Sequence, residues 1–267
     1  RAEPGGGKCL GGGDGVGGCG LVIDIRVISL PESLSRREAV DKQLSRLKVE
    51  YQFFDAVDGF GADPLLQRMD QKKFLFRNNR YPIAREAGCY ASHFRLWELC
   101  VANDRPMLIM EDDFDITECS GGIFNVIENL VQTYPFLKLE RLVKKKSRAL
   151  VSSQDGVKIF RYRKAPHCLL AYAISPVAAG QLLRSREQFL YPVDVFVRNF
   201  GIHGVPIFGM DPPLVDRSAL NYESSTIGDR SLAGPKWARL PRLYFKARNS
   251  LLNLWRFRVQ RDSWEHF

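Results

Sequence analysis

Four acidic side chains lie close together near the middle of the chain. Glu111, Asp112 and Asp113 are consecutive, and Asp115 follows two residues later. Like charges packed this closely repel one another unless a cation compensates them. Carboxylate oxygens suit Mg²⁺ or Mn²⁺, which proteins often share with substrate phosphates. The cluster therefore predicts a divalent-cation site, and the alternative is a surface turn that carries several acids without any ligand.

The residues before the acids indicate where such a site would lie in the fold. Met107 to Met110 form a short apolar run, which is typical of a buried strand. Ligands of open α/β sheets bind beyond the carboxyl ends of the strands, so the acids stand where a site is expected. In an acid-x-acid pair such as Glu111 and Asp113, one carboxylate can reach a metal while the other reaches a second ion, a water or a ribose hydroxyl.

Strand-like and helix-like segments alternate along the chain. Val22 to Leu30 is rich in β-branched residues and stops at Pro31, which predicts a first buried strand. Ser35 to Glu38 has the spacing of a capping box and predicts the start of a helix. Residue patterns predict further strands at 51–57, 107–110, 157–162 and 168–174, and helices at 85–101, 123–134 and 176–183. This order predicts an α/β fold with a central, mostly parallel mixed sheet flanked by helices.

The composition is that of a folded protein. The 267 residues are 45% hydrophobic and include 17 Phe, 9 Tyr and 4 Trp, which excludes fibrous and wholly disordered proteins. The six cysteines show no C-x-x-C spacing, so we expect reduced thiols. No apolar run approaches the roughly 18 residues of a membrane-spanning helix, and the first residues lack a secretory-signal pattern. We therefore expect a cytoplasmic protein, soluble or peripheral on the inner face of the cytoplasmic membrane.

The two ends of the chain differ from its body. Residues 1–20 are glycine-rich, and we interpret them as a disordered or artefactual leader. Their G-x-G-x-x-G pattern at 13–18 has no strand before it, which a dinucleotide-binding fingerprint requires. Residues 21–232 are predicted to form the folded domain, and residues 233–267 a basic amphipathic tail.

The tail carries much of the excess charge, which is formally +9 for the whole chain. Its basic residues alternate with aromatic and aliphatic ones, as between Arg239 and Arg261. This pattern suits peripheral contact with an anionic membrane. One alternative is nucleic-acid binding, and another is a terminal helix that packs on its own domain and keeps a solvated basic face.

An ordered series of segments resembles glycosyltransferase family 25, which includes bacterial lipooligosaccharide β-galactosyltransferases and collagen galactosyltransferases. The central block is Arg85-Glu86-Ala87-Gly88-Cys89-Tyr90-Ala91-Ser92-His93, then Trp97, then Leu108-Ile109-Met110-Glu111-Asp112-Asp113. Other segments resemble the family in the same order, namely 27–30 with 35–37, 53–59, 171–175 with 192–194, 212–215 and 224–227. Together they extend over roughly residues 22–229, and the ordered set is far more specific than any one segment.

The resemblance implies a GT-A-like fold, a UDP-sugar donor, usually UDP-galactose, and transfer with inversion to a saccharide acceptor. It implies that Asp113 and Glu111 bind Mn²⁺ or Mg²⁺, with Asp113 the more direct ligand. The donor-binding residues expected on this basis are Leu30, Arg36, Arg37, Ser92, His93, Glu111 and Asp112. The alternative for the two arginines is an exposed pair in a first helical turn, and the alternative for the histidine is a satisfied core residue.

Inverting transfer needs a base that takes the proton of the attacking acceptor hydroxyl. Asp194, in the family-like segment, is the first candidate, and its alternative role is a helix N-cap. Glu223 and Asp211 are further candidates. Segment 135–139 lacks the Trp-Asp pair that the resemblance leads us to expect, so acceptor contacts in that region stay open.

The sequence therefore favours a metal-dependent, inverting hexosyltransferase that moves galactose to a lipid-linked saccharide in lipopolysaccharide or lipooligosaccharide biosynthesis. A nucleic-acid-binding protein that uses the basic tail is a second hypothesis, but no recognisable reading module is present, and we expect no nucleic-acid partner. A metal-dependent phosphohydrolase is a third hypothesis. No local motif encodes the donor sugar, the acceptor linkage or the oligomeric state.

Overall fold

A computed structural model describes residues 23–117, 122–141, 148–154, 156–185, 188–218 and 234–260. The predicted leader at 1–20 and the candidate base Glu223 lie outside these residues. The strands of the main sheet are β1 (Asp24–Ser29), β2 (Gln52–Asp55), β3 (Met107–Glu111), β5 (Phe136–Lys138), β6 (Arg148–Gln154), β7 (Val157–Tyr162), β8 (Ala171–Ile174) and β9 (Phe208–Asp211). The helices are α1 (Leu34–Arg46), α2 (Gln71–Asn78), α3 (Ala84–Ala102), α4 (Ile123–Thr133), α5 (Pro176–Arg184), α6 (Val193–Arg198), α7 (Phe200–His203) and α8 (Arg239–Val259).

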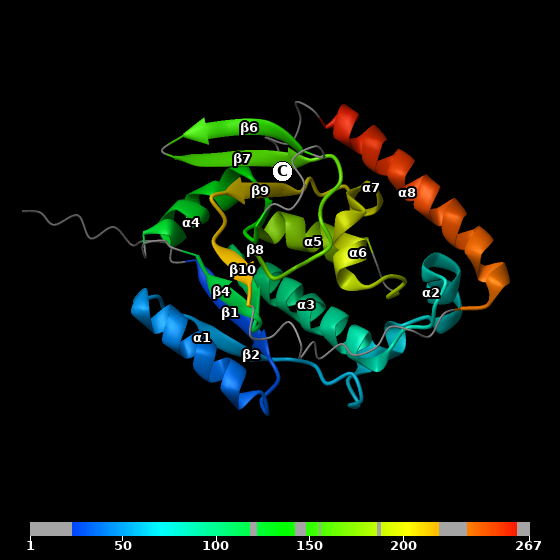
Figure 1. The fold of residues 1–267 in the computed structure, drawn as a ribbon, viewed down its shortest axis with the longest axis horizontal. Coiled ribbons are helices and arrows are strands. Elements are labelled where there is room, and N and C mark those ends of the chain that lie inside the picture. The colour runs from blue at the N-terminus through cyan, green and yellow to red at the C-terminus, as the bar shows by residue number, and fades with distance from the viewer. Residues whose placement is uncertain are drawn as a thin grey trace, which may run out of the picture.

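The main sheet has eight strands in the order β2-β1-β3-β8-β5-β9-β7-β6 (Figure 1). Strands β8 and β7 run antiparallel to their neighbours, and the other six strands of the sheet point the same way. The carboxyl ends of β1, β2, β3, β5 and β9 therefore meet at one edge. This arrangement confirms the predicted α/β fold with a mostly parallel mixed sheet.

Helices cover both faces of the sheet because side chains alternate along the buried strands. In β3, Met107 and Ile109 join the core formed with α3, α5, α6 and α7. Leu108 and Met110 point the other way, into the core formed with α1 and α4. Figure 1 shows these two groups of helices on opposite sides of the sheet. The acids that follow β3 are thus held by a strand that is packed on both faces.

The predicted helices and strands are largely confirmed, but one helix start is wrong. Helix α1 begins at Leu34, and its N-cap is Ser33, whose side chain makes no capping hydrogen bond. The capping box predicted at Ser35–Glu38 therefore falls inside the helix, because the chain turns directly after the strand. Helix α5 begins as predicted at Pro176, and the Ser175 hydroxyl accepts a hydrogen bond from a backbone N–H in its first turn.

Two glycines allow the segment after β2 to pass close to α3. A Cβ on Gly88 would lie 2.4 Å from the Val57 carbonyl oxygen, and a Cβ on Gly59 would lie 2.0 Å from the Ala84 carbonyl oxygen. The Ser92 hydroxyl stabilises this contact between the two segments, because it accepts from the Val57 N–H and donates to the Gly88 carbonyl oxygen, both at 2.8 Å. The close crossing brings the β2–α3 segment beside the carboxyl ends of the strands.

A small second sheet brings another segment to the same edge. Strand β4 (Phe114–Ile116) follows the acids directly and pairs antiparallel with β10 (Val215–Arg217). In this register Arg217 lies opposite Phe114, and the Ser218 N–H donates to the Asp113 carbonyl oxygen at 2.9 Å. Neither strand could be predicted from the sequence, because three residues are too few to show a strand pattern.

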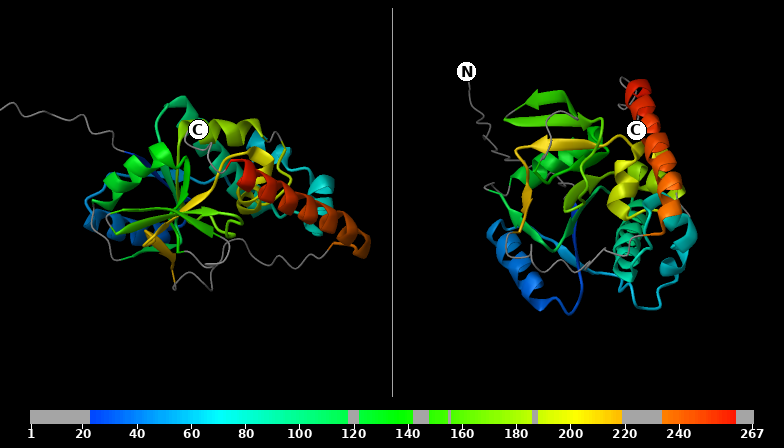
Figure 2. Two further views of the ribbon diagram at one scale, coloured as in Figure 1. Left: turned by 90° about the horizontal axis from the view of Figure 1, so that it is seen from above. Right: turned by 45° about the vertical axis from the view of Figure 1, so that its right-hand side comes forward.

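Helix α8 packs along α2 and α7 with a polar inner face (Figures 1 and 2). Asn249 donates to the Tyr191 hydroxyl at 3.0 Å, and the Asn253 side chain accepts from the Gly201 N–H at 2.7 Å. A Cβ on Gly201 would lie 2.6 Å from the α8 backbone, so the two helices touch closely. The described part of the predicted tail is therefore a helix packed on its own domain. Among the described helices, none is long and apolar enough to span a membrane.

Candidate functional site

A cavity of about 430 Å³ opens where the strands β1, β2 and β3 end. It lies between the β1–α1 turn, the β2–α3 segment, the start of α3 and the acidic cluster. Five acidic residues and three arginines line it, the acids being Glu32, Asp58, Glu111, Asp112 and Asp113 and the arginines Arg36, Arg85 and Arg217. The excess of carboxylates gives the cavity the charge balance expected of a cation-binding site.

Asp112 is held by direct partners. The Ser29 hydroxyl donates to its Oδ2 at 2.7 Å, and the Arg36 guanidinium donates to its Oδ1 at 3.0 Å. Both members of the ion pair are largely buried, with 14% and 11% of the side chain exposed for Arg36 and Asp112. The alternative of an exposed arginine in a first helical turn is therefore wrong for Arg36. Asp112 compensates this arginine and ties α1 to the end of β3.

Asp113, the next residue, has a different environment. Its Oδ1 is buried and has no hydrogen-bond partner within the described residues, and its Oδ2 lies 4.0 Å from the Arg217 guanidinium. Burial, and then the nearby charge of Glu111, raise the pKa of Asp113 from 3.8 to about 6. A carboxylate in this condition is costly to keep ionised unless a cation binds it. Asp113 is the acid of the cluster that most needs a metal.

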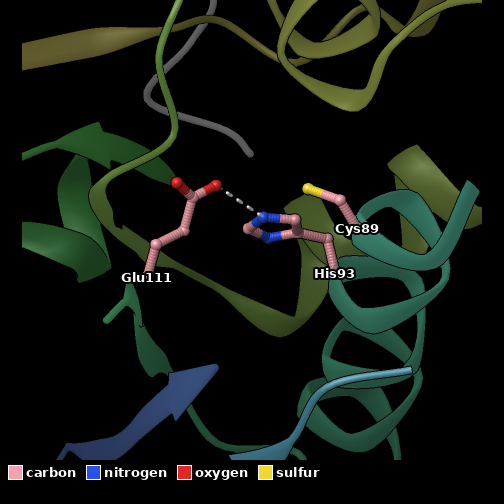
Figure 3. A group of neighbouring side chains, drawn as sticks. All are labelled: Cys89, His93 and Glu111. Carbon is pink, nitrogen blue, oxygen red and sulfur yellow. Dashed lines mark hydrogen bonds and ion pairs between the residues drawn. The ribbon is translucent and has the colours of Figure 1, made fainter. Parts of the chain in front are cut away.

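Glu111 and His93 meet across the cavity wall (Figure 3). His93 Nε2 lies 3.4 Å from Glu111 Oε1, and His93 Nδ1 lies 2.9 Å from the Tyr172 hydroxyl. The Trp97 indole N–H donates to the same hydroxyl at 3.0 Å. His93 is fully buried, so it is a core residue with its polar atoms satisfied and also lines the cavity. The side chain of Cys89, one turn earlier on α3, points toward the same place.

The other predicted donor residues divide into two groups. Leu30 and Ser92 line the cavity, although the Ser92 hydroxyl is already engaged in the β2–α3 crossing. Arg37 is not among the cavity-lining residues, and its guanidinium donates to the Asp55 carboxylate and to the Ser29 carbonyl oxygen. Arg37 therefore ties α1 to the ends of β1 and β2.

The candidate bases Asp194 and Asp211 are not among the residues that line the cavity. Asp194 is the second residue of α6, and its Oδ2 lies 3.7 Å from His167 Nδ1. It is not the N-cap of that helix, because the helix begins at Val193 and its N-cap is Pro192. The Asp194 carboxylate accepts from the neighbouring Val195 N–H at 2.8 Å. Asp211 ends β9 at the same sheet edge as the acids. Both stay candidates for the base.

The residues at the centre of the cavity fit a divalent cation. The unpartnered Oδ1 of Asp113 and the Glu111 carboxylate supply the oxygen ligands that Mn²⁺ and Mg²⁺ prefer. Both carboxylate oxygens of Asp112 already accept a hydrogen bond, one from Ser29 and one from Arg36, so Asp112 supports the site without being available as a ligand. Asp113 and Glu111 are therefore the residues of the cluster that could hold a metal.

The fold and the site together define a GT-A-like α/β protein with an acidic centre at the carboxyl edge of its sheet. The chain belongs to glycosyltransferase family 25, described as a family of lipopolysaccharide biosynthesis proteins, whose model matches residues 22–197. The matched segment contains all the acids of the cluster and the whole of α3. The family expected from the resemblance is thereby confirmed.

Individual relatives match over parts of their length. A putative glycosyltransferase of Haemophilus influenzae is 30% identical over 119 residues, which are 43% of this chain and 40% of the relative. The lipooligosaccharide biosynthesis protein lic2B of Haemophilus influenzae is 32% identical over 88 residues, 33% of this chain and 32% of the relative. The inactive glycosyltransferase 25 family member 3 of Homo sapiens is 27% identical over 194 residues, 65% of this chain and 31% of the relative. The chain thus spans 30–40% of the length of the curated relatives it matches, and one of them bears the name inactive, so activity has to be argued from the site.

Several residues of the site were not found by sequence analysis. Arg217 comes from a distant three-residue strand, and no local pattern marks it. Glu140 follows β5 at the same edge, where it is buried in an ion pair with Lys138 at 2.6 Å, and burial raises its pKa. Cys89 does carry a signal, because it lies four residues before His93 on a predicted helix and so shares its face.

The opposite environments of the two neighbouring aspartates predict opposite effects on stability. In the metal-free protein at pH 7, Asp112→Asn should lower the free energy of unfolding by about 1–3 kcal/mol, because Arg36 loses its buried partner. Asp113→Asn should raise it by about 1 kcal/mol, because a desolvated charge is removed. Urea unfolding with a chelator present measures both, and equal losses for the two variants would contradict the assignment.

The raised pKa of Asp113 also fixes how this difference depends on pH. The folded state holds the Asp113 proton up to about pH 6, whereas the ordinary pKa is 3.8. The free energy of unfolding of the metal-free protein therefore falls as pH rises through this interval. The increase in the free energy of unfolding caused by Asp113→Asn should accordingly disappear at or below pH 3.8. An increase that is the same at every pH would argue against the titration of this carboxyl.

Proposed function

We propose that this protein is an inverting, metal-dependent glycosyltransferase that moves a hexose, galactose, from a UDP-sugar to a saccharide acceptor in lipopolysaccharide or lipooligosaccharide biosynthesis. The observation that carries the proposal is the buried Asp113 carboxylate, which has an unpartnered oxygen and a raised pKa beside Glu111 in a cavity at the strand ends. Family membership supports the reaction class. The donor, the sugar and the stereochemistry are the proposed details.

The cavity has features that suit a nucleoside diphosphate sugar. Its volume lies within the range of small-molecule sites, and parallel strands end at its base. Arg85 and Arg217 line the cavity and supply positive charge that would orient the diphosphate. Mn²⁺, or Mg²⁺, held by the two acids would neutralise the developing charge on the UDP leaving group. Arg36 is not assigned to the diphosphate, because it already forms an ion pair with Asp112.

Asp194 is the proposed base for the acceptor hydroxyl. It lies next to His167, and the following residue, Cys168, has its pKa raised to about 12 by burial and by the charges of Glu140 and Glu111. The loop before β8 thus lies close to the acidic centre. The Asp194 side chain is 26% exposed, so an acceptor can reach it, and the neighbouring imidazole can stabilise its charge.

Loss of the proposed metal ligand should abolish most activity while the fold stays intact. Asp113→Asn is expected to lower turnover on the order of a hundredfold or more, because one preorganised electrostatic group is lost. The matched control is Asp115→Asn, two residues further on an exposed part of β4, which should keep turnover within about twofold. UDP release from a panel of nucleotide sugars with Mn²⁺ measures both variants.

The same assay separates transfer from hydrolysis. UDP release that requires a saccharide acceptor supports the transferase, whereas formation of UMP and hexose 1-phosphate without acceptor would favour a metal-dependent phosphohydrolase. Turnover of Asp113→Asn equal to that of the unchanged protein would remove Asp113 as a metal ligand. Release from UDP-glucose in preference to UDP-galactose would correct the proposed sugar.

A base that acts only on the acceptor should affect turnover and not donor binding. For Asp194→Asn we expect an unchanged dissociation constant for UDP in the presence of Mn²⁺ and a collapse of turnover by about a hundredfold or more. Calorimetry measures the first quantity and acceptor-dependent UDP release the second. Unchanged turnover would shift the role to Asp211, whose substitution by Asn is the paired variant.

We also propose that helix α8 holds the protein against an anionic membrane near its lipid-linked acceptor. The face of α8 away from the domain carries large apolar side chains, of which Leu243, Leu251 and Trp255 are 60%, 68% and 53% exposed. No acidic residue occurs between 236 and 260, and the helix carries six basic residues. Exposed aliphatic and basic side chains on one helix suit a membrane interface, which takes up both, better than nucleic acid, whose non-specific binding is mainly electrostatic.

Surface substitutions test this contact better than truncation, because α8 also covers α7. The triple variant Leu243→Ser, Leu251→Ser and Trp255→Ser should lower binding to phosphatidylglycerol-containing vesicles by about tenfold or more. The control variant Leu150→Ser with Val177→Ser changes exposed apolar residues elsewhere and should bind normally. Sedimentation with vesicles measures binding, and equal sedimentation of the two variants would contradict the proposal.

A further inference from the structure

Two side chains of α3 and one of β3 converge on one wall of the cavity. Cys89 and His93 are four residues apart, so they project from the same face of the helix. Figure 3 shows both pointing toward Glu111. One ligand atom from each of the three side chains, a sulfur, an imidazole nitrogen and a carboxylate oxygen, lies within 4.8 Å of the other two.

These separations approach those of a tetrahedral metal site. With metal–nitrogen and metal–oxygen bonds of about 2.0–2.1 Å, two tetrahedral ligands lie roughly 3.4 Å apart. His93 Nε2 and Glu111 Oε1 are 3.4 Å apart. A metal–sulfur bond is longer, about 2.3 Å, and the Cys89 sulfur, within 4.8 Å of both other ligand atoms, has to move closer to form the third corner. All three residues line the cavity, so a fourth position faces its open space.

The donor set selects a different cation from the one proposed for Asp113. A thiolate with an imidazole favours Zn²⁺, whereas Mn²⁺ and Mg²⁺ prefer oxygen ligands. Three protein ligands and one open position form the pattern of a zinc site that can bind water or another exogenous ligand. A carboxylate as the third ligand is common in such sites.

A second layer of hydrogen bonds already orients the histidine. His93 Nδ1 lies 2.9 Å from the Tyr172 hydroxyl, which also accepts from the Trp97 indole N–H at 3.0 Å. When Nε2 binds a metal, Nδ1 carries the proton and donates it to the phenol oxygen, as metal-bound histidines do to their outer partners. The imidazole is therefore fixed in direction before any ion arrives, and ion binding releases the protons of the ligand atoms.

We propose that Cys89, His93 and Glu111 form a Zn²⁺ site with one coordination position open to the cavity. The site is separate in its ligands from the oxygen site at Asp113, apart from the shared Glu111. Binding of the ion follows from the side-chain geometry and does not depend on the proposed transferase activity.

Cobalt(II) is the probe for this site, because it reports its ligands by absorption. The full chain, reduced and stripped of metal, is titrated with Co²⁺ and then with Zn²⁺. We expect a thiolate-to-cobalt charge-transfer band together with the intense visible bands of a tetrahedral ion. Excess Zn²⁺ should remove the charge-transfer band and the visible bands, because it displaces Co²⁺ from the same ligands.

Three variants assign the signal to this cluster. Cys89→Ser keeps the size of the side chain and should abolish the charge-transfer band, whereas Cys168→Ser, a half-buried thiol outside the cluster, should leave it unchanged. Tyr172→Phe should weaken binding by about tenfold to a hundredfold, because it removes the outer partner of His93. Circular dichroism checks that each variant is folded. A band that persists in folded Cys89→Ser, or no band in the unchanged protein at excess Co²⁺, would overturn the proposal.

Discussion

The burial of Asp113, whose charge is only weakly compensated by Arg217 at 4.0 Å, is the constraint on which the site depends. Its neighbour Asp112 is paired with Arg36 and accepts from Ser29, whereas Oδ1 of Asp113 has no hydrogen-bond partner among the described residues. Two identical side chains, adjacent in sequence, thus have different roles because they point into different surroundings. The first maintains the fold at the strand end, and the second carries a largely buried charge that a bound cation would stabilise.

The rest of the fold serves to bring partners to this strand end. Parallel pairing places the ends of β1, β2 and β3 together, and the crossing at Gly59 and Gly88 brings the next segment against α3. The short β4–β10 ladder carries Arg217 to the same edge from a hundred residues away in sequence. Glu111 lies between Asp113 and the Cys89–His93 pair. A cation bound beside Asp113 would therefore change the electrostatic potential at the Cys89–His93 pair, and a cation bound there would change it at Asp113.

Much of this arrangement could be predicted from the sequence, and the exceptions have physical reasons. The apolar run of β3 and the apolar face of α3 reveal burial, and acids after a strand reveal a site, because these signals are local. The roles of Arg36 and Arg37 could not be predicted, since both are basic residues in a first helical turn and only the tertiary contacts with Asp112 and Asp55 distinguish them. Helix α8 was ambiguous for a related reason, because its asparagines face inward while its leucines and tryptophan face out.

The most direct test of the account is electron paramagnetic resonance of Mn²⁺ titrated into the protein with UDP. The account predicts one tightly bound Mn²⁺ per chain whose spectrum shows coupling to the phosphorus nuclei of the diphosphate, and loss of this species when Asp113 is replaced by Ala. Mn²⁺ that binds equally well to the Asp113→Ala variant, or that shows no phosphorus coupling, would contradict the central claim that Asp113 holds a cation shared with the donor.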